Sequence, residues 1–488
     1  MSSLENLKNK AIQGMMWSSI GSLIFQVIRT LTQIVLARFL WPEAFGYLAI
    51  VMAFISISQY LIENGLTMHL IRSPQIDESL SSTIFYSNVG FSLIISLLLI
   101  LYAPFLARNY ESVDLSWMLQ LLALSLVFMA LGSVHKALLT RNIQFKGQVF
   151  VNLISATLAG IVAISLAILK FGIVALVVYN LLYQFLQWIL ITRIYSFKPI
   201  HRFNRKQFRE AISFSWKLML SGLINTIYEN IFNLIMGGIY NLTSLGFYSN
   251  ALKIRDGAAQ TLTDSIQKVS YPVLSSIQDD LAKFKESTKV ILKLSVYIIY
   301  PILFGLAALS EPLIKIVFGD LWLGMIPIMQ ILAMNGLLIP LHKVNLNILT
   351  SLGRSDLYLK LEFIKKAIAF TTLGFGFMLH WDLTLILWLL FFNATLGWMV
   401  NAHYSKNLIN YGFLEQLEDI SKTIIGSLMM AGVVWGTSQW ITSWTYLMLI
   451  VVLGIMTYLL ASILFIQTEF KTLWSIGLGY TKRFRIKR

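Results

Sequence analysis

The stretch WSSIGSLIFQVIRTLTQ, residues 17–33, decides the fold class of this chain. It is apolar except for residues at helical spacings of three and four, which therefore share one helix face: Ser18, Ser22, Gln26, Arg29 and Gln33. With its apolar neighbours it forms a segment, 12–36, that is long enough to cross a bilayer with Arg29 near the centre. A charged side chain at that depth costs about 2.5–3.5 kcal/mol to insert. We therefore expect Arg29 to face a water-filled cavity or an ion-pair partner, not lipid.

The composition indicates an integral membrane protein. Of 488 residues, 57% are hydrophobic and 12% are charged, and the mean hydropathy is +0.71; soluble domains carry about 25% charged residues. The net charge of +15 comes from basic residues in short loops between apolar runs, which is typical of the positive-inside rule and argues against nucleic-acid binding. The chain has no cysteine, its six histidines are far apart, and no HExxH, Walker A or GxGxxG motif occurs, so we expect no metal and no cofactor.

Windows of about 20 apolar residues recur along the whole chain and predict about 14 membrane spans. We place them at 12–36, 45–67, 82–104, 116–138, 148–168, 172–194, 212–238, 246–270, 289–309, 325–347, 362–380, 383–404, 421–440 and 445–466. Basic residues concentrate in alternate loops and in the C-terminal tail, which predicts that both termini are cytoplasmic. Between two of the spans, EPLIKIVFGDLW (311–322) is typical of an amphipathic helix on the external surface.

The chain also contains an internal repeat. A second polar stripe occurs at strict i, i+4 spacing, with Glu229 aligned to Arg29 at an offset of 200 residues: Lys217, Ser221, Asn225, Glu229 and Asn233. ARFLWPEAFGYLAI (37–50) and GGIYNLTSLGFYSNA (237–251) match at the same offset, which pairs Gly46 with Gly246. Six spans precede the second copy, so the halves are predicted to be parallel repeats of a transporter. The predicted domains are a six-span lobe, a basic cytoplasmic linker, a second six-span lobe, and two extra spans with a basic tail, at 1–195, 196–211, 212–407 and 408–488.

The eighth span is the least apolar. One face carries a polar stripe, while Arg255 projects from another side: Lys253, Asp256, Gln260, Asp264 and Gln267. Internal pairing, of Lys253 with Asp256 and of Asp264 with Lys268, and the lining of a cavity are both open and are compatible. In the matching span of the first half, Glu63 is the deepest acidic residue. The carboxylates that are candidates for ion coupling are Glu63, Glu229, Asp256 and Asp264.

Several loops resemble a known family. RFLWPEAFGYLAI (38–50) resembles the R-x-L-G-P-E-x-F-G loop of bacterial polysaccharide-transport proteins, with Trp41 in place of the usual glycine. Further matches follow in the family's order: ALLTRNIQFKG (137–147), LGFYSNALKI (245–254), IVFGDLW (316–322) and LGRSDLYLKLEFIKK (352–366). The chain is similar to Wzx-type lipid-linked oligosaccharide flippases of the colanic-acid and teichuronic-acid exporter branch. They belong to the multidrug/oligosaccharidyl-lipid/polysaccharide exporter superfamily, which implies two six-helix lobes around a central cavity and two C-terminal helices.

The resemblance implies that the chain moves undecaprenyl-diphosphate-linked oligosaccharides from the cytoplasmic to the outer leaflet of the bacterial plasma membrane by alternating access. Such a headgroup cannot cross hydrocarbon without polar contacts. The expected substrate-cavity residues are Gln26, Arg29, Gln33, Asn225, Asn233, Lys253 and Arg255. The expected partners are the lipid-linked glycan, membrane lipids, a polysaccharide polymerase and glycosyltransferases, with the transporter itself a monomer.

Three other functions are open at this point. A multidrug exporter or a lipid II exporter of the same superfamily would have a similar architecture. A membrane glycan polymerase or ligase handles related substrates, but it would need a large external loop with reactive residues, and the external loops here are short. We find no nucleophile–base constellation and therefore expect a transporter, not an enzyme.

Overall fold

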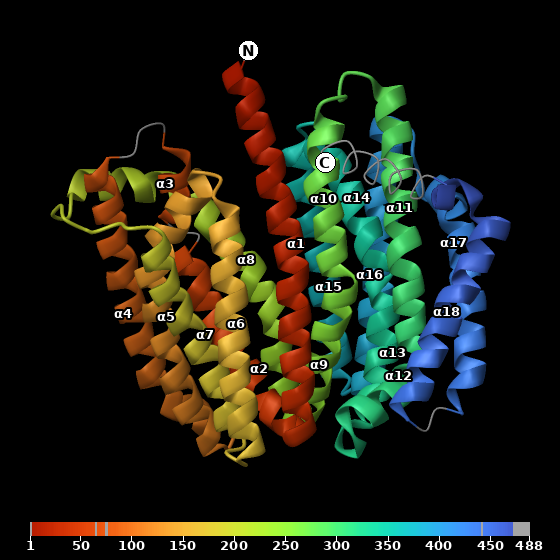
Figure 1. The fold of residues 1–488 in the computed structure, drawn as a ribbon, viewed down its shortest axis with the longest axis horizontal. Coiled ribbons are helices and arrows are strands. Elements are labelled where there is room, and N and C mark those ends of the chain that lie inside the picture. Colours follow the sequence, from red (N-terminus) through yellow and green to blue (C-terminus); the bar gives the residue numbers. More distant parts are fainter. Residues whose placement is uncertain (1, 64–65, 74–76, 441–442, 472–488) are drawn as a thin grey trace, which may run out of the picture. The chain divides into compact units, whose positions relative to one another are not determined.

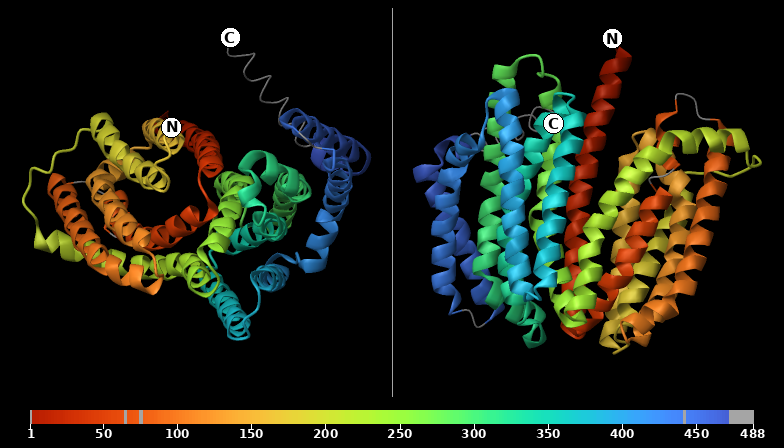
Figure 2. Two further views of the ribbon diagram at one scale, coloured as in Figure 1. Left: turned by 90° about the horizontal axis from the view of Figure 1, so that it is seen from below. Right: turned by 180° about the vertical axis from the view of Figure 1, so that it is seen from behind.

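The computed structural model describes residues 2–63, 66–73, 77–440 and 443–471, except for some side chains within the helices. The regular structure of these residues is helical. No strand occurs among them. The chain divides into two compact units, Met1–Ser249 and Asn250–Arg488. In each unit the long helices run side by side (Figure 1; Figure 2).

The first unit contains eight helices and the start of a ninth: α1 (Ser2–Phe39), α2 (Pro42–Glu63), α3 (Thr67–Arg72), α4 (Glu78–Asn109), α5 (Val113–Arg141), α6 (Phe145–Ile168), α7 (Val174–Ile194), α8 (Arg205–Ile239) and α9 (Leu242–Ala258). The second unit contains the rest of α9 and the following elements: α10 (Gln260–Ser275), α11 (Leu281–Ala308), α12 (Ser310–Leu313), η1 (Ile314–Phe318), η2 (Asp320–Trp322), α13 (Met325–Gly336), α14 (Leu338–Ser351), α15 (Ser355–Met378), α16 (Leu383–Ile409), α17 (Phe413–Ser438) and α18 (Trp444–Phe465).

Eleven helical segments of the described chain are long and apolar enough to cross a membrane. The prediction of an all-α, multi-pass membrane protein is therefore confirmed. The three other predicted spans, 212–238, 246–270 and 362–380, correspond to α8, to α9 with α10, and to α15. The total of about 14 spans and the cytoplasmic side of both termini stay predictions.

Four helix pairs of the first half have counterparts in the second. In the first unit α5 packs against α2, α4 and α7, and α6 packs against α7. In the second unit α14 packs against α10 and α16, α13 packs against α11, and α15 packs against α16. With α2 matched to α10 and α5 matched to α13–α14, the pairs correspond one to one, which supports the internal repeat. The predicted lobe boundaries stay predictions. Helix α8, which they place in the second lobe, packs against α2 and α4 of the first unit.

The two repeats meet within the first unit at a pair of glycines. A Cβ atom on Gly46 of α2 would lie 1.9 Å from the carbonyl oxygen of Leu242, and a Cβ atom on Gly246 of α9 would lie 1.9 Å from that of Pro42. No side chain fits at either position, so the glycine match in the sequence reflects a close approach of two backbones.

The linker between the repeats runs over the N-terminal end of α4. Phe197 stacks edge-on against Phe85, and Tyr86 donates a hydrogen bond to the carbonyl of Pro199 at 3.0 Å. Asn204 then caps α8 by accepting from the backbone N–H groups of Lys206 and Gln207. The helical part of this basic segment therefore begins at α8, and residues 195–204 are not helical.

The last two spans dock through charge as well as apolar packing. Lys285, Lys289 and Lys293 follow each other at i, i+4 spacing on α11 and face two acids of α17. Glu415 accepts from Lys285 at 2.9 Å and from Lys289 at 2.7 Å. Asp419 pairs with Lys293 at 2.8 Å. We call this set the lysine ladder.

A buried polar network joins α14, α16 and α17 beside the ladder. The side-chain amides of Asn345 and Gln416 exchange two hydrogen bonds of 2.9 Å. Ser405 donates to Asn345 at 2.6 Å, and Trp398 donates to Gln416 at 2.9 Å. Because each of these buried groups has a partner, the network fixes the three helices in one register.

The prediction of one amphipathic surface helix at 311–322 is wrong. The segment is divided into the short α12, a π turn η1 and a 3₁₀ turn η2, with Gly319 at a positive φ of 94° between the turns. Ile314, Phe318 and Trp322 are buried. Their burial against the second unit outweighs the helical periodicity of the isolated segment.

Candidate functional site

Helix α1 carries the predicted polar face, and Arg29 is its exposed member. Gln26 and Gln33 are half-buried, and Gln26 lies 3.4 Å from the hydroxyl of Thr30. Arg29 belongs to none of the ion pairs found among the described residues. No carboxylate therefore neutralises it there, and its role in lining a cavity stays a prediction.

Two tyrosines of α7 lie near Arg29. The guanidinium lies within electrostatic range of Tyr179 and Tyr183, whose rings stack with centroids 6.5 Å apart. Gln187 donates to the hydroxyl of Tyr183 and to the side-chain oxygen of Asn152, both at 2.6 Å. The first unit thus places a guanidinium beside a cluster of hydroxyl and amide groups, which are suitable partners for phosphate and sugar oxygens.

The polar stripe of α8 forms contacts within its own helix. Asn225 donates to Glu229 at 3.0 Å, so these two predicted site residues are brought together. Glu229 is exposed and Asn233 is half-buried. The side chains of Lys217 and Ser221 lie outside the described residues.

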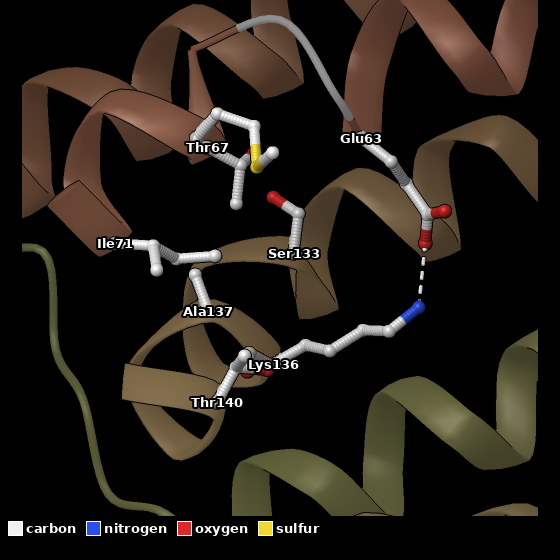
Figure 3. Close-up of a pocket in the computed structure, with 8 residues that line it drawn as sticks. Glu63, Thr67, Ile71, Ser133, Lys136, Ala137 and Thr140 are labelled. Atoms are coloured by element: carbon white, nitrogen blue, oxygen red, sulfur yellow. Dashed lines mark hydrogen bonds and ion pairs between the residues drawn. The ribbon is translucent and has the colours of Figure 1, made fainter. Parts of the chain in front are cut away.

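Glu63 forms an ion pair with Lys136 of α5, with 2.9 Å between the carboxylate oxygen and the ammonium nitrogen. Figure 3 shows the two side chains meeting beside a pocket of about 130 Å³ between α2, α3 and α5. Its walls combine the ion pair with hydroxyl and apolar groups: Glu63, Thr67, Met68, Ile71, Ser133, Lys136, Ala137 and Thr140. Glu63 is the last residue of α2 and its side chain is 35% exposed; that of Lys136 is 48% exposed.

Hydrogen bonds fix the helices that form this pocket. The buried Asn88 of α4 donates to Thr67 at 3.2 Å and to Ser133 at 2.9 Å. Arg141 of α5 donates to backbone carbonyls at the end of α3, including that of Leu70 at 3.1 Å. The pocket therefore has rigid walls on α3 and α5 and an ion pair at its edge.

In the second unit, Arg255 and Asp256 of α9 are paired. The guanidinium of Arg255 donates to Asp256 at 2.9 Å and to Asn335 of α13 at 3.2 Å. Lys253, on the same helix, is half-buried. Asp256 therefore pairs with Arg255, which was predicted to project from another side of the helix, and the pairing of Lys253 with Asp256 stays a prediction.

Asp264 of α10 pairs with Lys343 of α14, with 3.3 Å between the charged atoms. Gln260, one turn earlier, donates to the same carboxylate at 3.3 Å. The expected pairing with Lys268 is wrong, because α14 packs against α10 and presents a cation to that carboxylate.

The sequence interpretation missed both lysine partners, Lys136 and Lys343. A signal was present: of the six histidines, two are followed by lysine, at 135–136 and 342–343. Each dipeptide lies on the fourth span of its repeat, which is α5 in the first and α14 in the second. Each lysine pairs with the carboxylate on the second span of the same repeat, Glu63 or Asp264.

The second unit also has an apolar groove of about 690 Å³ between α11, α13, α16 and α17. Phe304, Ile331, Met334, Trp388 and Trp435 lie along it, and Gln330 and Thr384 add two polar groups. Its lining suits a hydrocarbon chain.

Residues 35–327 match the family described as "Polysaccharide biosynthesis protein". This span exceeds half of the chain. The chain belongs to that family. The polysaccharide biosynthesis family thus accounts for the loop motifs, which fall mostly within the matched residues.

Named relatives agree with this assignment. The chain is 24% identical over 372 residues to the lipopolysaccharide biosynthesis protein WzxC of Escherichia coli (strain K12), covering 74% of each chain. It is 23% identical over 360 residues to the teichuronic acid biosynthesis protein TuaB of Bacillus subtilis (strain 168), covering 72% of this chain and 74% of TuaB. It is 23% identical over 423 residues to the succinoglycan biosynthesis transport protein ExoT of Rhizobium meliloti (strain 1021), covering 86% and 84%.

Solved structures show a shared fold. The lipid II flippase MurJ, in an inward closed conformation, matches with a TM-score of 0.72 and 18% identity over 93% of this chain and 99% of MurJ. An inward-facing multidrug resistance transporter of the MATE family and the MOP superfamily matches with a TM-score of 0.60 and 14% identity, covering 83% and 98%. This member of the polysaccharide biosynthesis family therefore has the MOP-type transporter fold and is a multi-pass protein of the bacterial inner membrane.

Proposed function

We propose that this protein moves undecaprenyl-diphosphate-linked oligosaccharide repeat units from the cytoplasmic to the outer leaflet for surface polysaccharide biosynthesis. The family match over residues 35–327 carries the proposal. The names of TuaB, WzxC and ExoT place those relatives in polysaccharide biosynthesis or its transport. The action is transport by alternating access of a repeat-built fold, without a chemical step.

The charged residues within membrane helices support an anionic cargo. A diphosphate needs cationic and hydrogen-bonding partners when it leaves water. In this proposal Arg29, with Gln26 and Gln33 on α1 and with Asn225 and Asn233 on α8, contacts the headgroup from the first unit. For the second unit, Lys253 and Arg255 are the proposed headgroup contacts.

The apolar groove of the second unit supports a lipid-linked cargo. An isoprenoid chain gains free energy from apolar contact and needs no hydrogen bonds, so a groove with two tryptophans at its edge suits it. In this proposal the headgroup crosses the protein while the chain stays at its lipid-facing side.

The proposal extends to coupling and partners. Glu63, Glu229, Asp256 and Asp264 are the carboxylates proposed to bind a coupling cation. The protein works as a monomer beside a polysaccharide polymerase and glycosyltransferases, which supply and consume its cargo.

The test is translocation in proteoliposomes. Lipid-linked repeat units carrying a labelled glycan are incorporated with the purified protein, and an external glycosidase reports the fraction that becomes accessible. Protein-dependent exposure is expected. Absence of exposure with every diphosphate-linked glycan, in vesicles that take up hydrophobic cations, would instead favour a multidrug exporter.

A lipid II exporter is the second candidate, because MurJ shares the fold. The same vesicles distinguish it: exposure of lipid II in preference to oligosaccharide-linked lipid would favour that cargo. A polymerase or ligase would lengthen or transfer the glycan, which the labelled product reveals by its size.

A further inference from the structure

Each repeat contains a lysine–carboxylate pair between corresponding helices. Glu63 and Lys136 join α2 to α5 in the first unit. Asp264 and Lys343 join α10 to α14 in the second. The two helix pairs occupy matching places in the packing of their repeats.

The sequence around the pairs is repeated as well. Gln-x-Leu-x-acid occurs at 59–63 and at 260–264, and His-Lys occurs at 135–136 and at 342–343. The offsets of 201 and 207 residues agree with a duplication followed by small insertions. Both members of the pair, not only their helices, are therefore repeat-related.

The histidine of each His-Lys dipeptide contacts a different part of its repeat from the lysine that follows it. His135 lies 3.3 Å from the carbonyl of Phe197, just beyond α7. His342 lies 3.1 Å from the side-chain amide of Asn401 on α16, the helix that matches α7. Each imidazole thus contacts the last span of its repeat or the residues just after it. The lysine that follows contacts the second span. The histidine contact therefore orients the lysine toward its carboxylate.

A role in stability alone explains these pairs poorly. Their four side chains are 35–48% exposed, and ion pairs at such exposure contribute little to stability. An ammonium has three donors, and the bond to Glu63 uses one of Lys136. Beside Lys136 lies the pocket with the hydroxyls of Thr67, Ser133 and Thr140, which has room for about four waters.

We propose that Lys136, within the first unit, and Lys343, within the second, are each a contact for the diphosphate of the transported lipid. In each unit the paired carboxylate, Glu63 or Asp264, accepts from the lysine when no substrate is bound. The inference rests on the proposed function and names two of its headgroup contacts. A phosphate oxygen is the same kind of acceptor as a carboxylate oxygen, so it replaces the acid at the ammonium without new cationic groups. Glu63 is the last residue of α2 and its side chain is 35% exposed, which leaves space for it to rotate away from Lys136.

The two members of a pair then have opposite effects on binding. Removal of the ammonium removes a charge-assisted hydrogen bond to phosphate, whereas removal of the carboxylate charge removes a competitor. If the pairs were only structural, both changes would break the same contact and weaken binding alike.

The experiment measures binding of undecaprenyl diphosphate to the full-length protein in nanodiscs, with inorganic pyrophosphate as the free-anion arm. Lys136→Ala and Lys343→Ala are each expected to weaken binding of the lipid about tenfold, the low end for a charged hydrogen bond. Glu63→Gln and Asp264→Asn are expected to bind as tightly as wild type or more tightly. Lys268→Ala, an exposed lysine of α10, is the matched control and is expected to bind as wild type.

Equal weakening by both members of a pair, or lysine variants that bind like Lys268→Ala, would overturn the inference. Lysine-dependent binding of pyrophosphate with lysine-independent binding of the lipid would overturn the assignment to the headgroup. Where an alanine variant fails to fold, Lys136→Arg and Lys343→Arg test the same point, since retained charge must retain binding. Normal translocation with lysine-independent binding removes this inference alone, whereas a wild-type protein that translocates nothing removes the proposed function.

Discussion

At the scale of single residues, Arg29 is a guanidinium in the apolar part of α1 that no carboxylate neutralises among the described ion pairs. Arg29→Ala is expected to lower glycan exposure in proteoliposomes at least about tenfold, because a cationic contact to phosphate is lost. Arg29→Lys is expected to retain part of the activity, since it keeps the charge and loses the forked geometry.

The control for that change is Arg108→Ala, which removes an exposed arginine from the end of α4. It is expected to leave translocation at the wild-type rate. Normal translocation by Arg29→Ala at normal membrane abundance would exclude Arg29 from the substrate path.

The contact between Gly46 and Gly246 gives a second prediction at this scale. Gly46→Ala and Gly246→Ala would each place a methyl group 1.9 Å from a backbone carbonyl, so α2 or α9 must move. Each is expected to destabilise the protein by about 1–3 kcal/mol, the usual cost of overpacking. The measurement is thermal unfolding in detergent.

Gly90→Ala is the matched control, because a Cβ atom there has open space within α4. It is expected to unfold at the wild-type temperature or slightly above it, since alanine favours helix. Equal unfolding temperatures for all three variants would mean that the contact between α2 and α9 has no energetic importance.

At the scale of elements, the lysine ladder makes the docking of α17 depend on Glu415. Glu415→Gln leaves Lys285 without its carboxylate and leaves Lys289 with Glu286 at 3.9 Å; both lysines are 21% exposed, and the change is expected to cost roughly 1–2 kcal/mol. Glu418→Gln, on the exposed side of α17, is expected to cost little. Limited proteolysis between α16 and α17 reports the difference; equal cleavage of the two variants would contradict it.

Tyr411, in the loop before α17, strengthens this docking. Burial, together with the charge of Asp419, raises the pKa of the Tyr411 hydroxyl above its ordinary value. The hydroxyl therefore keeps its proton and donates to Asp419 at 2.9 Å. Asp419 of the lysine ladder therefore accepts a hydrogen bond from a tyrosine hydroxyl that stays protonated through the physiological pH range.

The helices were predictable from sequence to different degrees. Apolar length located α4, α5 and α16, because a bilayer requires about 20 apolar residues whatever their neighbours. The breaks at Ala259 and Leu337 and the turns around Gly319 were not predictable, since packing against other helices decides them. Polar spacing identified Glu63 and Asp264 but not Lys136 and Lys343, because a stripe shows which face a residue occupies and not which helix covers it.

At the scale of the whole molecule, loop charge predicts which side each connection faces. The chain has no cysteine, so a single one is a clean label. Val113→Cys, 82% exposed at the start of α5, is expected to react with a membrane-impermeant maleimide in intact cells. Arg202→Cys, in the basic linker, is expected to react only after the membrane is opened; the reverse pattern would invert the topology.

The contact at Gly46 and Gly246 has a consequence for the origin of the chain. Pro42 to Gly46 of one repeat meets Leu242 to Gly246 of the other, and each glycine approaches the residue that starts the opposite helix. This reciprocity is the mark of an isologous interface, in which one patch meets its own copy. A half-length ancestor with a single repeat would therefore have formed a homodimer through this glycine. Fusion of two gene copies would then have joined the two subunits of that dimer into one polypeptide.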